Sequence, residues 1–350
     1  MFSRISFVDK LFFVDHLRTM THASLSLVES LSILSKETRS KKFKAIIAEI
    51  SHDVEEGNQL SAVLAKYPRV FPPIYVKMVE SGEVSGKLDE SLTQVVIQMK
   101  KTHALLSSIR GAMMYPAVVV TAMIGVGVLM TTVILPKLLE IFDEFDAELP
   151  LATRILIAVT KFMSNPVNLA IVLMALILGL VLFISGLKKN LQFRRLIHTV
   201  NLHLPIAGHV VKQINLARFS LTLSSLLKST IPIIDAVEIT AGTCTNLLYQ
   251  EALRATAKDM KSGTPMSEIL ARYPKLFSPM VTEMVMVGER AGEVDRLLVE
   301  LSEFYNEEVD KTMKNFTTII EPVLIVLLGL VVGGVAVAVI MPMYSLVQNF

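Results

Sequence analysis

The sequence predicts an all-α membrane protein with two homologous cytoplasmic helical bundles, of about six helices each, and three transmembrane helices. Three observations predict this fold class. Apolar residues make up 52% of the 350 residues and charged residues only 19%, below the roughly 25% typical of soluble proteins. The charges are absent from three long stretches, and one part of the chain repeats another. This composition excludes disorder, and the single cysteine, Cys244, excludes a disulfide-stapled secreted module.

The three charge-free stretches predict the transmembrane helices. They are 26, 26 and 29 residues long and lie between Arg110 and Lys137, between Lys161 and Lys188, and after Glu321. Each contains an apolar run of about 20 residues, with which an α-helix crosses roughly 30 Å of hydrocarbon. A buried core helix is the alternative, but core helices seldom run so far without a charge. We place the predicted transmembrane helices at 116–135, 167–187 and 322–341.

The distribution of the 34 Lys and Arg residues predicts the topology. Segment 1–115 contains 15 of them and segment 188–321 contains 16, whereas 136–166 contains three. The positive-inside rule therefore predicts cytoplasmic helical domains at 1–115 and 188–321. It also predicts an external loop at 136–166, a cytoplasmic N-terminus and a short external tail at 342–350. The charged residues among the first 20 argue against a signal peptide.

An internal duplication underlies this organisation. Residues 65–92 align without a gap on 271–298 at an offset of 206, and 12 of the 28 positions are identical. The same offset pairs Phe13 with Phe219 and Pro116 with Pro322. The repeat unit is therefore a helical domain plus the membrane helix that follows it. The middle span returns the chain, so that both copies face the same side.

Apolar periodicity predicts the helices of each copy. In the first copy the apolar residues recur at spacings of three, four and seven, which indicates one helical face. They are Phe13, Leu17, Met20, Leu27, Leu31 and Leu34. Ser24 interrupts this face and predicts a tight turn between two helices. We expect a third helix at about 41–55, a fourth ending before Pro68, a fifth at about 73–81 and a sixth from near Gly86.

Both copies contain a Gly-Glu-x-x-Gly-x-x-Asp motif. Its residues are Gly82, Glu83, Gly86 and Asp89 in the first copy and Gly288, Glu289, Gly292 and Asp295 in the second. A nucleotide-binding phosphate loop has four residues between its glycines, and here there are three. Two interpretations remain. The glycines end one helix and the Asp begins the next, or the motif forms a partner-binding surface.

No residue pattern predicts a catalytic, cofactor or metal site. The seven histidines show no ligand spacing, and His198, His203 and His209 lie in a basic stretch that we expect to be loop-like. No ionisable residue lies near the centre of a span, which argues against a pump or transporter. Gly329 and Gly333 form a GxxxG pattern that predicts close helix packing, with general apolar spacing as the alternative.

Further motifs carry a family resemblance. The sequences MMYP at 113–116 and IEP at 320–322 open the first and third spans with Tyr115, Pro116, Glu321 and Pro322. With the repeated Tyr-Pro…Phe…Pro…Gly-Glu-x-x-Gly motif at 67–86 and 273–292, they resemble the type II secretion system F / type IV pilus assembly PilC-like (GspF/PilC) inner-membrane platform proteins. The resemblance covers about 10–345. Many members carry an N-terminal extension, whereas the first domain here begins almost at Met1.

The resemblance implies a non-enzymatic platform without cofactors in the bacterial inner membrane. It would couple a cytoplasmic hexameric ATPase to the extraction and polymerisation of pilin or pseudopilin subunits. Other implied partners are inner-membrane platform components, further copies of this chain and the lipid bilayer, with no direct nucleic-acid contact. The alternatives are a membrane subunit of a transporter or channel, and a membrane-anchored signalling adaptor.

Overall fold

The computed structural model describes residues 5–134, 154, 158, 160–162, 165–204 and 207–348, and these contain helices and no strand. The chain divides into two compact units. We call Met1–Ser108 with Arg195–Lys311 the bundle unit, and Ile109–Arg194 with Thr312–Phe350 the apolar-helix unit. Most of the predicted external loop at 136–166 lies outside the described residues.

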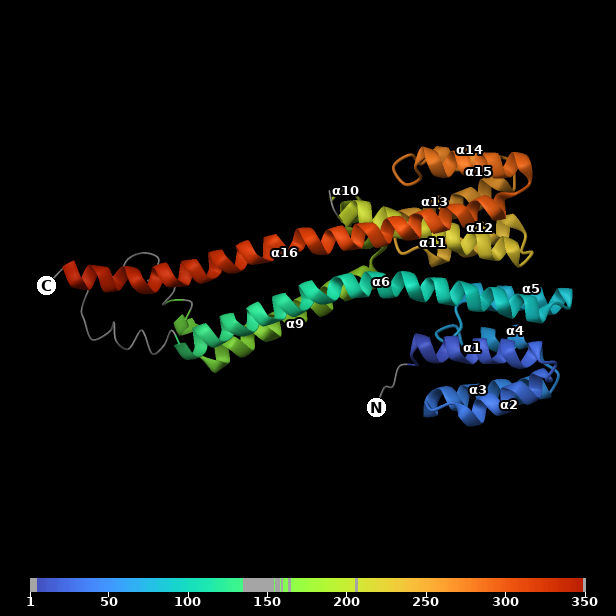
Figure 1. Ribbon diagram of the computed structural model, residues 1–350, viewed down its shortest axis with the longest axis horizontal. Coiled ribbons are helices and arrows are strands. Elements are labelled where there is room, and N and C mark those ends of the chain that lie inside the picture. Colours follow the sequence, from blue (N-terminus) through green and yellow to red (C-terminus); the bar gives the residue numbers. More distant parts are fainter. Residues whose placement is uncertain are drawn as a thin grey trace. The chain divides into compact units, whose positions relative to one another are not determined.

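Each copy of the repeat forms six helices within the described residues, as the periodicity predicts. The first copy contains α1 Phe7–His22, α2 Leu27–Glu37, α3 Lys41–Glu55, α4 Leu60–Ala65, α5 Pro73–Ser85 and α6 Leu88–Leu129. The second contains α11 Ala207–Lys228, α12 Ile233–Thr243, α13 Leu247–Met260, α14 Met266–Ala271, α15 Pro279–Ala291 and α16 Val294–Gln348. In the first copy α1, α2 and α3 lie side by side (Figure 1).

The predicted turn at Ser24 is confirmed. Ser24 has a φ of 64° and its repeat counterpart Thr230 a φ of 57°, so both occupy the left-handed region that ends a helix. The backbone N–H of Leu25 donates to Met20 O at 3.1 Å, and that of Ile231 donates to Leu226 O at 3.2 Å. The same turn therefore separates the first two helices of each copy.

Each copy has its own core, built around aromatic residues at equivalent positions. In the first copy the ring centroid of Phe13 lies 5.6 Å from that of Phe43 and 5.8 Å from that of Phe71. Their counterparts at the 206 offset are Phe219, Tyr249 and Phe277, and all six side chains are buried. Aromatic side chains bury large apolar areas, which explains why each copy packs as a domain.

Two sequence-based expectations were wrong. The fifth helix, expected at about 73–81, continues to Ser85, because the left-handed residue that ends it is Gly86. The basic stretch expected to be loop-like is helical, since α10 spans Leu191–His203 and α11 begins at Ala207. Asn190 explains the start of α10, because its Oδ1 accepts the backbone N–H groups of Gln192 at 3.0 Å and Phe193 at 3.2 Å. An Asn N-cap of this kind begins a helix.

Within the described ranges, three helices are long and apolar enough to cross a membrane, as predicted. They are α6, α9 (Pro166–Lys189) and α16, and a short π-helix, η1 (Met130–Ile134), follows α6. The most apolar window of each of the three has no buried side chain. Leu182 in α9 is 62% exposed and Leu330 in α16 is 72% exposed. Apolar surfaces of this extent indicate contact with hydrocarbon or another protein rather than water.

Candidate functional site

The repeated glutamates bind the N-termini of the short fourth helices. Oε1 of Glu83 accepts the backbone N–H of Leu60 at 2.5 Å, and Oε2 accepts that of Ser61 at 2.9 Å. In the second copy Glu289 accepts the N–H groups of Met266 at 2.6 Å and Ser267 at 3.1 Å.

These carboxylates replace a missing helix cap. Neither α4 nor α14 receives a side-chain hydrogen bond from its own N-cap residue. A carboxylate satisfies N–H groups that have no partner within the helix, and it complements the positive end of the helix dipole. Sequence reasoning missed this contact because the partners are 22 and 23 residues apart. The available signal was a short helix that begins without a capping side chain.

The first glycine of each motif permits two helices to cross closely. A Cβ added to Gly82 would lie 2.3 Å from Ser91 Cβ, and one added to Gly288 would lie 2.9 Å from Val294 Cα. Both distances are shorter than any ordinary carbon contact. Glycine at these positions therefore sets the approach of α5 to α6 and of α15 to α16.

The second glycine of each motif ends its helix. Gly86 has a φ of 71° and Gly292 a φ of 73°, a conformation that glycine adopts without strain. The backbone N–H of Lys87 donates to Gly82 O at 2.8 Å, which closes the end of α5. The motif aspartates then lie in the first turns of α6 and α16.

Asp89 also connects two helices of the first copy. Its Oδ2 lies 2.9 Å from Nδ1 of His22, at the end of α1. The counterpart of His22 in the second copy is Lys228. In the first copy the four motif residues thus lie around one helix corner, where Glu83 and Asp89 connect adjacent helices. The partner-binding interpretation of the same motif stays a prediction.

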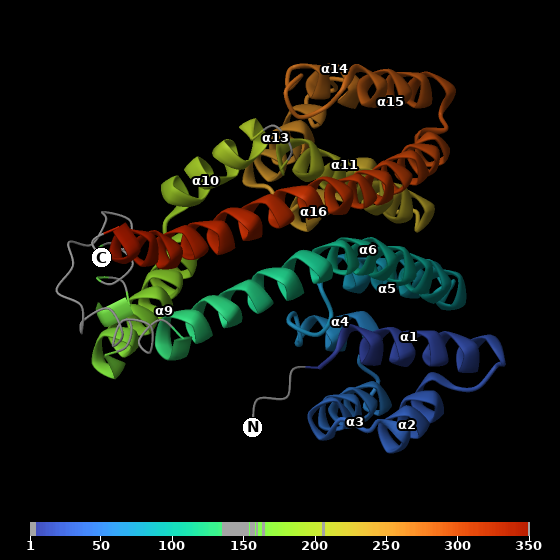
Figure 2. The same cartoon turned by 60° about the vertical axis from the view of Figure 1, so that its left-hand side comes forward.

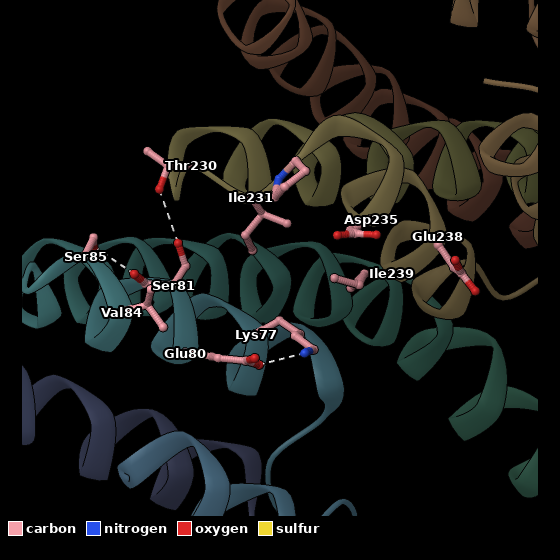
Figure 3. Close-up of a pocket in the computed structure, with 11 residues that line it drawn as sticks. Lys77, Glu80, Ser81, Val84, Ser85, Thr230, Ile231, Asp235, Glu238 and Ile239 are labelled. Atoms are coloured by element: carbon pink, nitrogen blue, oxygen red, sulfur yellow. Dashed lines mark hydrogen bonds and ion pairs between the residues drawn. The ribbon is translucent and has the colours of Figure 1, made fainter. Parts of the chain in front are cut away.

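A groove of about 690 Å³ lies between α5 and α12 of the bundle unit (Figure 3). Because the two helices belong to different copies, we call it the inter-repeat groove. It is lined by Lys77, Glu80, Ser81, Val84, Ser85, Thr230, Ile231, Pro232, Asp235, Glu238 and Ile239. The sequence did not predict this groove, because it exists only where one copy packs against the other.

Hydrogen bonds fix one end of the inter-repeat groove. The Ser81 hydroxyl donates to the backbone carbonyl of Ser229 at 2.5 Å and lies 3.2 Å from Thr230 Oγ1. Deeper in the same interface, Gln98 Oε1 accepts the Ser225 hydroxyl at 2.7 Å. Side chains of the first copy thereby hold the α11–α12 turn of the second.

The inter-repeat groove is acidic and partly apolar. Glu80 pairs with Lys77 at 2.7 Å (Figure 3). Asp235 and Glu238 on α12 form no ion pair within the described part of the chain. Val84, which lines the same groove, is 79% exposed. Unpaired carboxylates next to apolar side chains complement a segment that is both basic and apolar.

The remaining candidate groups are possible metal ligands and the single cysteine. Among the described residues no group of three or more His, Cys, Asp and Glu side chains is placed to hold a metal ion. Cys244 is buried, and its burial raises the pKa of the thiol to about 12. A thiol that is neutral and inaccessible at neutral pH is a poor nucleophile.

The candidate residues of the spans lie within long helices. Tyr115 and Pro116 lie inside α6, and Glu321 and Pro322 lie inside α16. Added Cβ atoms at Gly329 and Gly333 of α16 would meet no atom within 4 Å. The two glycines thus leave room on α16 for another helix.

Comparison with known proteins decides the family. The family model for type II secretion system (T2SS) protein F matches residues 13–136 and again 219–342. The chain belongs to the type II secretion system protein F family. The two matches are offset by 206 residues, so each copy of the duplication is one family domain. Each match includes a helical bundle and the apolar helix region that follows it.

Relatives in the protein F family resemble this chain over almost its whole length. The type IV pilus assembly protein PilC of Thermus thermophilus is 36% identical, over 97% of this chain and 82% of the relative. PilC of Pseudomonas aeruginosa is 31% identical, over 97% and 90%. The type II secretion system protein F of Pseudomonas aeruginosa is 27% identical, over 95% and 81%.

Proposed function

We propose that this protein is the non-enzymatic inner-membrane platform of a type II secretion or type IV pilus-like assembly machine. The observation that carries the proposal is the double match to the protein F family. The relatives are named as pilus assembly and secretion proteins. The fold supports a platform role, since two helical domains are each followed by an apolar helix that can enter a membrane.

Charge and duplication support one topology. The basic residues concentrate in 1–115 and 188–321, which the positive-inside rule assigns to the cytoplasm. The spans at 116–135, 167–187 and 322–341 then place the N-terminus inside and the C-terminus outside. Both helical domains are on the side where a cytoplasmic ATPase works. The loop at 136–166 faces the periplasm.

The inter-repeat groove is our candidate contact for the ATPase. Asp235 and Glu238 present two carboxylates without ion-pair partners in the described chain, and Val84 adds exposed apolar surface. A basic segment of a cytoplasmic hexameric ATPase fits this chemistry. Because the groove is formed by both copies, motion of that segment would be transmitted to α5 and α12 together. The pilin or pseudopilin subunits, other platform components and further copies of the chain would contact the spans.

The test uses the full-length protein in lipid nanodiscs and the assembly ATPase of the same organism. We expect a measurable complex and a changed ATPase rate when the platform is added. Glu238→Lys should weaken the complex about tenfold, because it places a positive charge in the groove. Glu283→Lys is the matched control, since Glu283 is an exposed carboxylate of α15 outside the groove.

Three outcomes separate the parts of the proposal. Equal binding by both variants and the unchanged protein would exclude the groove as the contact and leave the platform role intact. Equal weakening by both would indicate a general charge effect rather than a site. Absence of any complex, with an unchanged ATPase rate, would contradict the coupling function.

A further inference from the structure

Helix α10 follows the second apolar helix almost without a linker. α9 ends at Lys189 and α10 begins at Leu191 as a separate helix (Figure 2). The single residue between them, Asn190, has extended backbone angles and caps the start of α10. Consecutive Cα atoms are about 3.8 Å apart. If α9 spans the membrane, as the proposed function requires, α10 must begin at the membrane surface.

From Arg195 onward α10 belongs to the bundle unit, and one of its faces contacts the start of α13 within that unit. Nδ1 of His198 accepts the backbone N–H of Leu247 at 2.7 Å, and the His198 carbonyl accepts Nδ2 of Asn246 at 3.1 Å. Arg195 lies 3.5 Å from Glu251. These contacts fix the rotation of α10 about its own axis, so the opposite face has a defined direction.

The opposite face of α10 is apolar, and no side chain of this helix is buried. Its apolar residues recur at spacings of three and four, which places them on one helical stripe. They are Phe193, Leu196, Ile197 and Val200, and Leu204 continues the spacing just past the end of the helix. Leu196 is 59% exposed and Val200 47% exposed. We call these five residues the apolar stripe.

The apolar stripe is continuous with the surface of α9. The ring of Phe193 packs edge-on against that of Phe183, with 5.9 Å between the centroids. A Cβ added to Gly186 would lie 3.2 Å from the Phe193 ring. The glycine therefore leaves the space that the ring occupies. Phe183 is itself exposed on a helix that hydrocarbon would surround. The stripe therefore starts at the lipid-facing side of α9.

The charged residues in the sequence of this junction are basic. Lys188, Lys189 and Arg194 lie within seven residues of one another, and Arg195 is paired with Glu251. No acidic residue occurs in the sequence between Glu148 and Asp235. Basic clusters next to a span attract the anionic lipids of the cytoplasmic leaflet.

We propose that α10 is an interfacial membrane-binding helix whose apolar stripe lies at the boundary of headgroups and acyl chains. The basic residues at its start and at the end of α9, Lys188, Lys189 and Arg194, bind anionic lipid headgroups. A helix with this segregation of apolar residues and this basic charge is suited to lie in the plane of the membrane surface. Because its other face holds Asn246 and Leu247, α10 attaches the second copy of the repeat to the lipid surface.

The test places single cysteines in the full-length Cys244→Ser protein, reconstituted in nanodiscs. Val200→Cys reports on the apolar stripe. Val84→Cys, on exposed α5 surface, is the water-exposed control, and Ile177→Cys in α9 is the control for membrane insertion. A fluorophore on each cysteine is challenged with lipid-borne quenchers at shallow and deep positions and with a water-soluble quencher.

We expect shallow lipid quenching at Val200→Cys and none at Val84→Cys. The reference is the Val200→Cys protein in nanodiscs that contain phosphatidylglycerol. Relative to it, the ratio of membrane-bound to free α10 should fall in nanodiscs of phosphatidylcholine alone. It should also fall when Arg194→Gln is added in phosphatidylglycerol. The expected fall is about fivefold for each basic side chain that no longer binds an anionic headgroup. Leu196→Glu tests the apolar stripe itself, and it should reduce quenching by the shallow lipid quencher of the fluorophore at position 200.

The results that would contradict the proposal can be told apart. Water-soluble quenching at Val200→Cys without lipid quenching would overturn the proposal, and so would protection from both quenchers, which indicates a covering protein. Equal lipid quenching in phosphatidylcholine and in phosphatidylglycerol would show that α10 does not need anionic headgroups, which contradicts that part of the proposal. Failure of Ile177→Cys to respond to deep quenchers would show that α9 does not span the membrane, which contradicts the proposed function itself.

Discussion

Oε1 of Glu289 accepts the backbone N–H of Met266 at 2.6 Å, so a side chain of α15 caps the first turn of α14. The Glu83–Leu60 bond in the first copy is its equivalent. The duplicated glutamates therefore connect the fourth and fifth helices of each copy. This relationship makes stability the property to measure first at these positions.

We expect Glu289→Ala to lower the stability of the folded protein by about 1.5–3 kcal/mol, because hydrogen bonds to a charged acceptor contribute in that range. Thermal unfolding of the purified protein in nanodiscs measures the decrease. Glu283→Ala, on the same helix but exposed, should have little effect. Wild-type stability and abundance of Glu289→Ala, combined with failed assembly in cells, would instead favour a partner-binding surface.

The helix crossing at the motif predicts a second stability effect. Gly82→Ala should destabilise by about 1–3 kcal/mol, since its Cβ would overlap Ser91 and force the helices apart. Gly242→Ala, in α12, is the control, because its Cβ would meet nothing within 4 Å and alanine favours a helix. Denaturant titration of both variants should therefore give changes of opposite sign. Equal stability of the two would show that α5 and α6 do not pack as closely as described.

The topology prediction needs an engineered thiol. Cys244 is buried with its thiol pKa raised to about 12, so a membrane-impermeant maleimide should leave it unlabelled until the protein is denatured. In the Cys244→Ser background, Asp146→Cys should label in intact cells and Val84→Cys only after permeabilisation. Position 146 lies outside the described residues, and its placement rests on the charge distribution. The reverse labelling pattern would place both helical domains outside, away from any cytoplasmic ATPase.

The glycines of the third span predict an effect on association. Around Gly333 the chain leaves space for an added Cβ, so Gly333→Leu should not disturb the folded monomer. Leucine would keep a neighbouring helix at a distance, and we expect fewer oligomers in chemical crosslinking or analytical ultracentrifugation. Leu327→Phe, at an exposed position on the opposite face of the same helix, is the control. Unchanged oligomers in Gly333→Leu would exclude this face.

The sequence alone determined the features that depend on local or periodic patterns. The charge-free stretches predicted α6, α9 and α16 as apolar spans, because crossing hydrocarbon requires length and absence of charge. The offset of 206 predicted two equivalent bundles, and Ser24 predicted the turn between their first helices. These properties need only neighbouring residues or a comparison of the chain with itself.

The tertiary structure decided what depends on distant residues. It showed that Glu83 reaches the backbone of Leu60 and that Asp235 and Glu238 border a groove formed with α5. The Asn190 cap was readable in the sequence, but the docking of His198 on Leu247 was not. Packing brings together residues whose spacing in the chain has no period, so no local pattern could have predicted these contacts.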